Sequence, residues 1–192
     1  MICTSRGKRL ERSVRPRHDQ PVLTLRPLTD ADEPAARAAH AELVQDGFEF
    51  LLDEHDGEPW PDYVVRRNLH AHGIGLPEGF VPETFLLAFA ERELVGRVSI
   101  RHTLNDFLLQ VGGHIGYGVR PAFRRRGYAT AILRQALVVV RDLGVDKALV
   151  TCDDDNVASA RTIERCGGVL HNVVEPPASG PAKRRYWIGL SG

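Results

Sequence analysis

Residues 124–137, RRRGYATAILRQAL, decide the fold. Apolar side chains recur at helical spacing after Gly127, so we expect a helix over residues 127–143. The first turn of a helix carries N–H groups without intrahelical acceptors and the positive end of the helix dipole, which together favour a bound anion. Gly127 has no side chain to block a phosphate, and Ala129 is small. The stretch indicates a phosphate site or, alternatively, a solvated basic helix start whose arginines pair with acids elsewhere.

The segments on either side of this stretch alternate between strand and helix patterns. Strands are expected over residues 22–28, 84–90, 94–104, 114–119, 148–152, 169–174 and 184–190, and helices over 31–45, 61–71, 127–143 and 155–166. Residues 48–82 mix glycine, proline, aromatic and acidic residues, which is typical of an irregular insertion or lid. The order of elements predicts an α/β (α+β) fold, in which helices flank a mixed, largely antiparallel central sheet.

Composition indicates one globular domain over residues 21–192, because 43% of the 192 residues are hydrophobic. Residues 1–20 are basic and almost without apolar partners, so we expect a disordered arm, either a nucleic-acid tail or a loose leader. A formal net charge of zero argues against general attraction to nucleic acid or an anionic membrane. No apolar run is long enough to span a bilayer, and we expect a cytoplasmic protein.

Several kinds of site are excluded by missing motifs. The three cysteines, Cys3, Cys152 and Cys166, are far apart and form no C-x-x-C pair, so we expect reduced, structural thiols and no metal. The chain lacks a G-x-x-x-x-G-K-[ST] phosphate loop and a G-x-G-x-x-G dinucleotide fingerprint between a strand and a helix. The acidic run at residues 153–155 lacks the ligand spacing of a calcium loop.

A longer stretch carries a family resemblance. HIGYGVRPAFRRRGYATAILRQAL followed by ALVTCDDDNVASARTIERCGGVL closely resembles the GNAT superfamily of N-acetyltransferases. The pyrophosphate loop of that family reads Q/R-x-x-G-x-G/A, and residues 124–129 match it. The resemblance covers residues 114–170 well, and the expected order of elements elsewhere fits the same fold. It implies acetyl-coenzyme A as co-substrate, bound where the parallel strands 114–119 and 148–152 splay apart.

The resemblance also assigns residues to the binding of acetyl-coenzyme A. The backbone of the 114–119 strand would hold the pantetheine arm and polarise the acetyl carbonyl, the arginine loop would hold the pyrophosphate, and the next helix would add two contacts. These residues are, in that order, Tyr117, Gly118 and Val119; Arg124, Arg125, Arg126, Gly127, Tyr128, Ala129 and Thr130; and Asn156 and Ser159. For Asn156 the alternative is plain helix capping.

The catalytic groups common in the family are missing here. Ile163 stands where many members carry a tyrosine acid, and Thr151 stands where some carry a carboxylate base. An attacking amine with a pKa near about 10.4 must lose a proton at neutral pH, so a replacement base is needed. We expect Asp153 as base, or else a solvated turn residue, and Tyr117 as a further catalytic candidate. His114 on the same strand is another candidate, and catalysis mainly by positioning remains an alternative.

The amine acceptor is predicted only by an acidic cluster in the irregular segment. Four carboxylates lie beside two aromatic residues, a combination that attracts and covers a cationic amine, or else forms an exposed acidic loop. These residues are Asp53, Glu54, Asp56, Glu58, Trp60 and Tyr63.

Three function classes follow from these patterns. The first is an N-acetyltransferase that transfers the acetyl group of acetyl-coenzyme A to a primary amine of a small molecule, peptide N-terminus or lysine, by direct attack in a ternary complex. The second is a non-catalytic acyl-coenzyme A binding or regulatory module. The third, a nucleic-acid binder, is disfavoured by the neutral charge and by the absence of aromatic residues between the arginines. A homodimer through the late strands is also expected.

Overall fold

The computed structural model describes residues 22–175 and 180–190, so the predicted arm over residues 1–20 and Cys3 lie outside the described residues. The strands are β1 (Thr24–Arg26), β2 (Glu83–Ala90), β3 (Glu93–Arg101), β4 (Ile115–Val119), β5 (Lys147–Asp153), β6 (Val169–Val174) and β7 (Lys183–Gly189). The helices are α1 (Glu33–Val44), α2 (Trp60–Ala71), α3 (Tyr128–Asp142) and α4 (Val157–Arg165). Short helical turns are η1 (Asp30–Asp32), η2 (Leu108–Gly112) and η3 (Pro121–Phe123).

The strands form one sheet in the order β1-β2-β3-β4-β5-β7-β6. Among the described residues, only the central pair β4–β5 is parallel, and the other neighbouring strands run antiparallel. Two strands joined through a helix can lie parallel, whereas the short turn between β2 and β3 forces an antiparallel hairpin. This topology confirms the predicted mixed, largely antiparallel sheet with one parallel pair.

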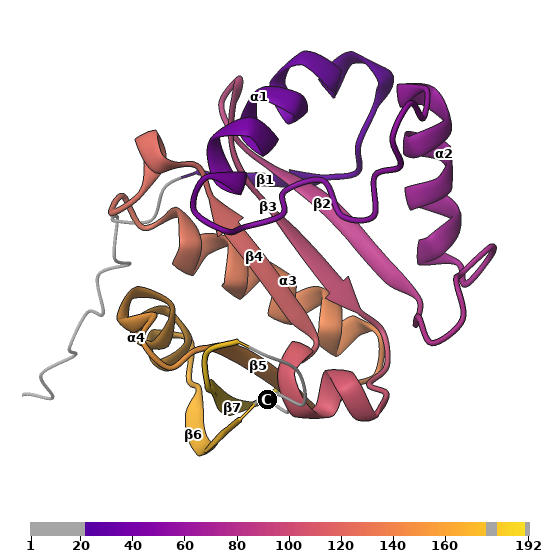
Figure 1. Cartoon of the computed structure of the whole chain (residues 1–192). Coiled ribbons are helices and arrows are strands. Elements are labelled where there is room, and N and C mark those ends of the chain that lie inside the picture. Colours follow the sequence, from indigo (N-terminus) through magenta and orange to yellow (C-terminus); the bar gives the residue numbers. More distant parts are fainter. Residues whose placement is uncertain (1–21, 176–179, 191–192) are drawn as a thin grey trace, which may run out of the picture.

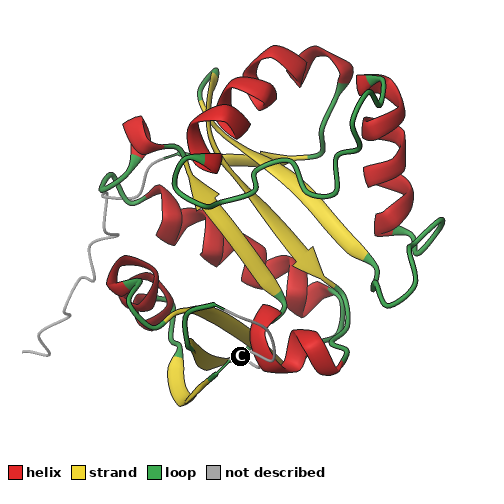
Figure 2. Cartoon of the chain, in the orientation of Figure 1, coloured by secondary structure: helices red, strands yellow, loops and turns green. Residues whose placement is uncertain are grey.

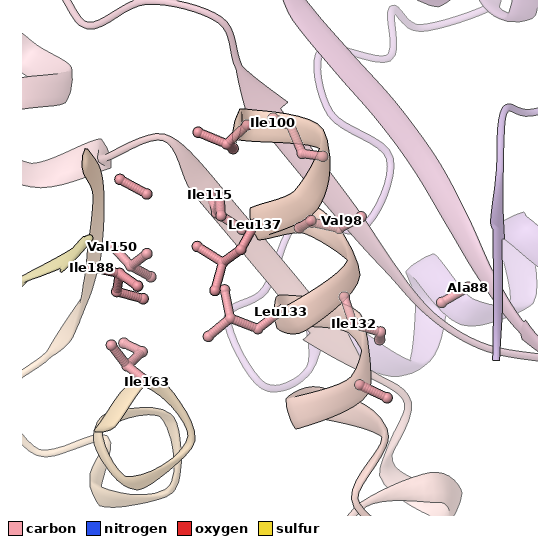
Figure 3. Close-up of a cluster of buried hydrophobic side chains, with 14 of the residues drawn as sticks. Ala88, Val98, Ile100, Ile115, Ile132, Leu133, Leu137, Val150, Ile163 and Ile188 are labelled. Atoms are coloured by element: carbon pink, nitrogen blue, oxygen red, sulfur yellow. The ribbon is translucent and has the colours of Figure 1, made fainter. Parts of the chain in front are cut away.

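Helices cover both faces of the sheet (Figure 1). On one face, α3 and α4 pack against β2 to β5 through buried aliphatic side chains, among them Ile132, Leu133 and Ile163 (Figure 3). On the other face, α1 and α2 cover β2 and β3 with a second buried cluster that includes Phe50 and Tyr63. Burial of apolar surface on both faces fixes the two outer layers relative to the sheet.

The parallel strands β4 and β5 are held together at one end only. Their register contains the single pair Ile115 and Val150. Just before it, the His114 N–H donates to the Leu149 carbonyl at 2.7 Å, and the Leu149 N–H donates to Nδ1 of the His114 ring at 2.9 Å. Beyond this connection the backbone groups of the two strands do not pair with each other, so the strands splay as the family resemblance implies.

The segment between β3 and β4 differs from the prediction. Strand β3 ends at Arg101 instead of residue 104, and a π-helical turn, η2, follows at Leu108–Gly112. The Asn105 carboxamide oxygen accepts from the Leu108 N–H at 2.9 Å, and this side-chain contact replaces strand pairing. Gly113 then takes φ +65° where a β-carbon would lie 2.7 Å from the Leu149 carbonyl oxygen, so the chain can enter β4 only with glycine there.

The sheet ends at β6, whose outer edge has no partner among the described residues. Three apolar side chains of this strand, Val169, Leu170 and Val173, are exposed. The predicted homodimer through the late strands stays a prediction.

Within residues 22–175 and 180–190, no helix is long and apolar enough to cross a membrane. The same ranges hold no group of three or more His, Cys, Asp or Glu side chains arranged for a metal ion. Cys152 is buried and Cys166 half-buried, and both are free thiols.

Candidate functional site

A cavity of about 850 Å³, here called the splay cavity, opens where β4 and β5 diverge and the N-terminus of α3 begins. Its wall contains nearly all the residues predicted to bind acetyl-coenzyme A, from three separate elements. They are Tyr117, Gly118, Val119, Arg124, Arg125, Gly127, Tyr128, Ala129, Thr130, Asn156 and Ser159. Asp153, the predicted base, lines it too, whereas Arg126 does not.

The N-terminus of α3 offers unpaired backbone donors to this cavity. Gly127 is the N-cap residue with φ +83°, a left-handed conformation that glycine adopts without steric cost. The first intrahelical hydrogen bond runs from the Ala131 N–H to the Gly127 carbonyl at 3.1 Å. The N–H groups of residues 128–130 therefore have no acceptor within the helix, and together with the helix dipole they suit a phosphate.

The three arginines before Gly127 do different things. Arg124 donates to the Val119 carbonyl at 3.1 Å and pairs with Asp46 at 2.6 Å, so it fixes the loop against β4 and the chain after α1. Arg126 is exposed, and its guanidinium lies 5.7 Å from the centre of the Phe123 ring. Arg125 borders the cavity with φ +61°. The alternative of arginines paired with acids is thus correct for Arg124.

Two further arginines on α4 were missed by the sequence analysis. Arg161 and Arg165 lie four residues apart on one face of the helix and line the splay cavity. Their i, i+4 spacing in the predicted helix indicates that both lie on one helix face. The sequence alone does not show that this face points toward the splay cavity. They place two more cations beside the N-terminus of α3.

The opposite wall of the splay cavity comes from the loop between α1 and α2. Figure 2 shows this loop passing across β4, β3 and β2. Its Phe48 ring lies over Gly118, where a β-carbon would be 2.4 Å from the ring. The buried Arg97 holds the loop in place, because its guanidinium lies 4.4 Å from the Phe48 ring centre and donates to the Glu49 carbonyl at 2.7 Å. Burial lowers the pKa of Arg97 to about 9.

Tyr117 extends from β4 toward α4. Its hydroxyl lies 3.1 Å from the Ser159 hydroxyl, at the cavity wall. Burial raises the pKa of Tyr117 to about 12, so the phenol is protonated throughout the neutral range. The structure therefore supplies a neutral O–H group in the cavity, although Ile163, at the usual position of the family's tyrosine, is fully buried in the core.

Asp153 and Asn156 are each used in another contact. The Asp153 carboxylate pairs with Lys183 of the neighbouring strand β7. The Asn156 carboxamide oxygen accepts from the Ser159 N–H at 3.0 Å, which makes it the N-cap of α4 and confirms the capping alternative. Its amide nitrogen and the second lone pair of its oxygen are left for a ligand.

Thr151 and His114 hold the chain together at the closed end of the splay. The Thr151 hydroxyl donates to the Val111 carbonyl at 2.7 Å, and the buried His114 ring accepts from the Leu149 N–H. Burial lowers the pKa of His114 below its ordinary value. Both side chains are structural, and His114 is not free to act as the catalytic base.

The acidic cluster predicted to attract the amine is largely neutralised by arginines. Arg66 pairs with Asp53 at 2.8 Å and with Glu58 at 2.6 Å, while Arg37 pairs with Glu54 at 2.5 Å. The charge that would attract a cationic acceptor is therefore balanced within the protein.

The two aromatic residues of that cluster are also unavailable. Trp60 and Tyr63 are 3% and 0% exposed, and both point into the core under α2. The Trp60 N–H donates to the Thr29 carbonyl at 3.1 Å, and the Tyr63 hydroxyl donates to the Leu52 carbonyl at 3.2 Å. The prediction that they cover a bound amine was wrong, because aromatic residues beside acids in sequence can turn inward to pack.

A second cavity of about 360 Å³, here called the α2 cavity, lies beside α2, β2 and the end of β3. Phe48 lines the splay cavity and the next residue, Glu49, lines the α2 cavity. The chain at residues 48–49 therefore borders both cavities, and Arg97 fixes it. Glu49 is exposed, and no ion pair formed within the described ranges involves its carboxylate.

A family model supports the same reading of the fold. Residues 22–169 match the model of the acetyltransferase (GNAT) domain. The chain belongs to the GNAT acetyltransferase family. No curated protein sequence matches this GNAT chain significantly.

Solved structures show the same fold at low sequence identity. A spermidine N-acetyltransferase from Vibrio cholerae, in complex with CoA and spermine, is 18% identical, with 88% of this chain and 95% of that chain covered and a TM-score of 0.61. RimJ from Mycobacterium smegmatis, in complex with CoA-disulfide, is 18% identical, with 88% and 82% covered and a TM-score of 0.63. The putative acetyltransferase yncA from Salmonella typhimurium, with its cofactor acetyl-CoA, is 13% identical, with 88% and 94% covered and a TM-score of 0.58.

Proposed function

We propose that this GNAT protein is an N-acetyltransferase that uses acetyl-coenzyme A and a primary amine in a ternary complex. The observation that carries the proposal is the splay cavity, in which β4, the α3 N-terminus and α4 meet. Its volume of about 850 Å³ lies within the range of about 300–1,000 Å³ usual for ligand sites. The CoA or acetyl-CoA named with the similar structures supports the same co-substrate.

The residues of the cavity suit the parts of acetyl-coenzyme A. The unpaired N–H groups of residues 128–130 and the Arg125 guanidinium suit the pyrophosphate. Arg161 and Arg165 add charge for a further phosphate. The backbone at Tyr117–Val119 pairs with β3 on one side, and on the side that faces β5 the splay leaves it free to donate to the pantetheine arm and the acetyl carbonyl.

In the transfer step the amine nitrogen attacks the acetyl carbonyl carbon, and the bond from that carbon to sulfur breaks. The new amide nitrogen loses one proton, and the departing thiolate gains one. Tyr117 is our assignment for the acid, because its neutral hydroxyl lies in the cavity and its raised pKa keeps the proton in place. The thiolate is a moderate base, with a thiol pKa near about 8.5, so this acid helps only modestly.

Two carboxylates are candidates for the base. Asp153, expected from the sequence, is paired with Lys183. Glu49 was not expected from the sequence, and it lies at the wall between the two cavities with no ion pair among the described residues. Among the described residues the Glu49 carboxylate accepts only from the Asp53 N–H at 3.4 Å, so its remaining acceptor positions are open to the proton of an amine. We assign the base to Glu49.

The test is release of free thiol from acetyl-coenzyme A with a panel of polyamines, aminoglycosides, amino acids and peptides. Amine-dependent thiol release supports the transferase. Tight binding of acetyl-coenzyme A without thiol release for any amine would instead favour the non-catalytic acyl-coenzyme A binding module, for which the paired Asp153 and the buried Ile163 are the supporting observations.

A further inference from the structure

The α2 cavity contains two arginines that are withdrawn from solvent. Arg67 of α2 has 4% of its side chain exposed, and Arg101 at the end of β3 has 19%. Both line the cavity. Burying a guanidinium is costly unless its charge and its donors are matched, so two such groups in one cavity need anionic partners.

Among the residues that the structure describes, a single carboxylate pairs with these two arginines. Glu83 of β2 pairs with Arg67 through one oxygen and with the Nε of Arg101 at 3.0 Å through the other. In the part of the chain that the structure describes, no hydrogen bond or ion pair uses either terminal amino group of Arg101. The two terminal nitrogens of Arg101 thus form a face suited to a carboxylate.

The other titratable groups that line the cavity form no ion pair with Arg101. Asp53 is paired with Arg66 at 2.8 Å. His70 is buried, and burial lowers its pKa, so its ring is neutral at pH 7. The Glu49 carboxylate accepts from the Asp53 N–H at 3.4 Å and has no ion pair among the described residues, and it lies beside Phe48 at the wall to the splay cavity. Glu49 and Arg101 therefore offer the cavity one carboxylate and one guanidinium that form no ion pair with each other.

Arg101 also lies close to the strand that faces the thioester. A β-carbon on Gly116 would be 3.0 Å from the Arg101 Nη1 atom, so the guanidinium lies against β4 one residue before Tyr117. An anionic group bound there is next to the backbone assigned to the acetyl group. An amine one or two atoms away from that anionic group is thus placed near the reaction centre.

The remaining wall of the α2 cavity is apolar. Phe80 and Phe107 are 57% and 61% exposed and both line the cavity, with Leu76, Val81 and Leu108. The Asn105 amide donates to the Gly79 carbonyl at 2.8 Å and joins the two loops that carry these phenylalanines. Exposed aromatic rings at a cavity are suited to an apolar ligand group.

We propose that the acceptor is a free α-amino acid with an apolar side chain, whose carboxylate binds Arg101, whose amine lies toward Glu49 and β4, and whose side chain contacts Phe80 and Phe107. This inference rests on the proposed acetyl transfer. An apolar amino acid suits this cavity better than a polycationic acceptor, which would place positive charge against Arg67 and Arg101.

The first experiment compares L-phenylalanine, L-phenylalaninamide and phenethylamine as acceptors in the thiol-release assay. Hydrogen bonds to charged groups contribute about 1.5–3 kcal/mol, so we expect kcat/KM for L-phenylalanine to be about 10- to 100-fold higher than for the other two. The amide has the less basic amine and is the more deprotonated at assay pH, so amine ionisation cannot produce a preference for L-phenylalanine over the amide, which makes the amide the deciding comparison. Equal rates for the three compounds, or transfer only to polyamines or peptide N-termini, would overturn the inference.

The second experiment uses matched arginine variants. Arg101→Gln should raise KM for L-phenylalanine about 10- to 100-fold while leaving KM for acetyl-coenzyme A and for L-phenylalaninamide unchanged. Arg101→Lys keeps the charge but not the paired donors, so its KM for L-phenylalanine should lie between those of the wild type and Arg101→Gln. Arg92→Gln, in the exposed turn at the other end of β3, removes the same charge away from both cavities and is the control. An unchanged KM for L-phenylalanine in Arg101→Gln would contradict the proposal.

Calorimetric titration of L-phenylalanine into the full chain with CoA present gives a readout without catalysis. If L-phenylalanine binds the wild type but not Arg101→Gln, and no thiol is released, the amino-acid site is supported and the proposed transferase activity is not. Thiol release with other amines but no binding of L-phenylalanine to the wild type would support the transferase and overturn the amino-acid site.

Discussion

The hydroxyl of Tyr117 lies 3.1 Å from the hydroxyl of Ser159 and joins β4 to α4 across the open end of the parallel strand pair. Tyr117 is held there because β4 and β5 pair only at Ile115 and Val150 and leave room for a side chain between them. The phenol thus occupies the gap that the splay creates, on the side of the sheet where α3 and α4 pack.

Tyr117→Phe should lower kcat toward the low end of the range for general acids, about 10²-fold, because the thiolate is only a moderate base and its protonation helps modestly. KM for acetyl-coenzyme A should change little, since the ring is retained. The pKa of about 12 further predicts that wild-type activity shows no loss from phenol ionisation between pH 7 and 10. Steady-state kinetics over that range give both values. Ser159→Ala, which keeps the phenol, is the control and should lower kcat by less than Tyr117→Phe does.

Gly127→Ala should weaken CoA binding about tenfold, because a methyl group there opposes the left-handed φ of +83° and obstructs the N–H groups of the next turn. Gly144→Ala is the matched control. It has φ +84° at the other end of α3, away from the splay cavity, so both variants should lose about 1–2 kcal/mol of stability. Calorimetric Kd values for CoA and thermal melts separate the two effects. Equal CoA affinity in the two variants would argue against phosphate binding at Gly127.

Glu49→Gln should lower kcat/KM about 10²-fold, whereas Asp153→Asn should lower it by less than about tenfold. The reason is that Glu49 has no ion pair among the described residues and accepts only from the Asp53 N–H, while Asp153 pairs with Lys183 and is 38% exposed. The Glu49→Gln deficit should shrink as pH rises, since the amine then loses its proton without a base. Rate profiles from pH 7 to 10 for both variants test this assignment. A larger loss in Asp153→Asn would return the role to Asp153.

The parts of the site that could be predicted from the sequence depend on local geometry. Gly127 and the first turn of α3 form a short continuous stretch, so the chain itself dictates where the free N–H groups lie. The order of strands and helices was likewise predictable, because hydrophobic periodicity is set within each element. The parallel β4–β5 pair came from the family resemblance and was confirmed.

The parts that could not be predicted depend on contacts between distant segments. Phe48 covers Gly118, which lies 70 residues later in the sequence, because the buried Arg97 holds the loop between α1 and α2 in place. Nothing local marks Arg101 as facing a cavity, since a strand residue's face is known only once the sheet is covered. The prediction that Trp60 covers a bound amine was wrong for the same reason, because the burial of its side chain depends on which segments pack against it.

His114 links stability to pH. Burial lowers its pKa in the folded protein below the ordinary value near about 6.5, and its Nδ1 must be unprotonated to accept from the Leu149 N–H. Its contribution to stability is therefore fully present above about pH 6.5 and is lost as pH falls through the folded pKa.

His114→Asn keeps an acceptor oxygen but cannot titrate, so its Tm should fall less than that of the wild type between pH 7 and 5. His70 and His102, whose pKa values burial also lowers, should leave a residual slope in that variant. His171→Asn, which removes an exposed ring on β6, is the control and should keep the wild-type slope, as measured by thermal melts at each pH. Identical slopes for His114→Asn and the wild type would show that this histidine carries no part of the acid sensitivity.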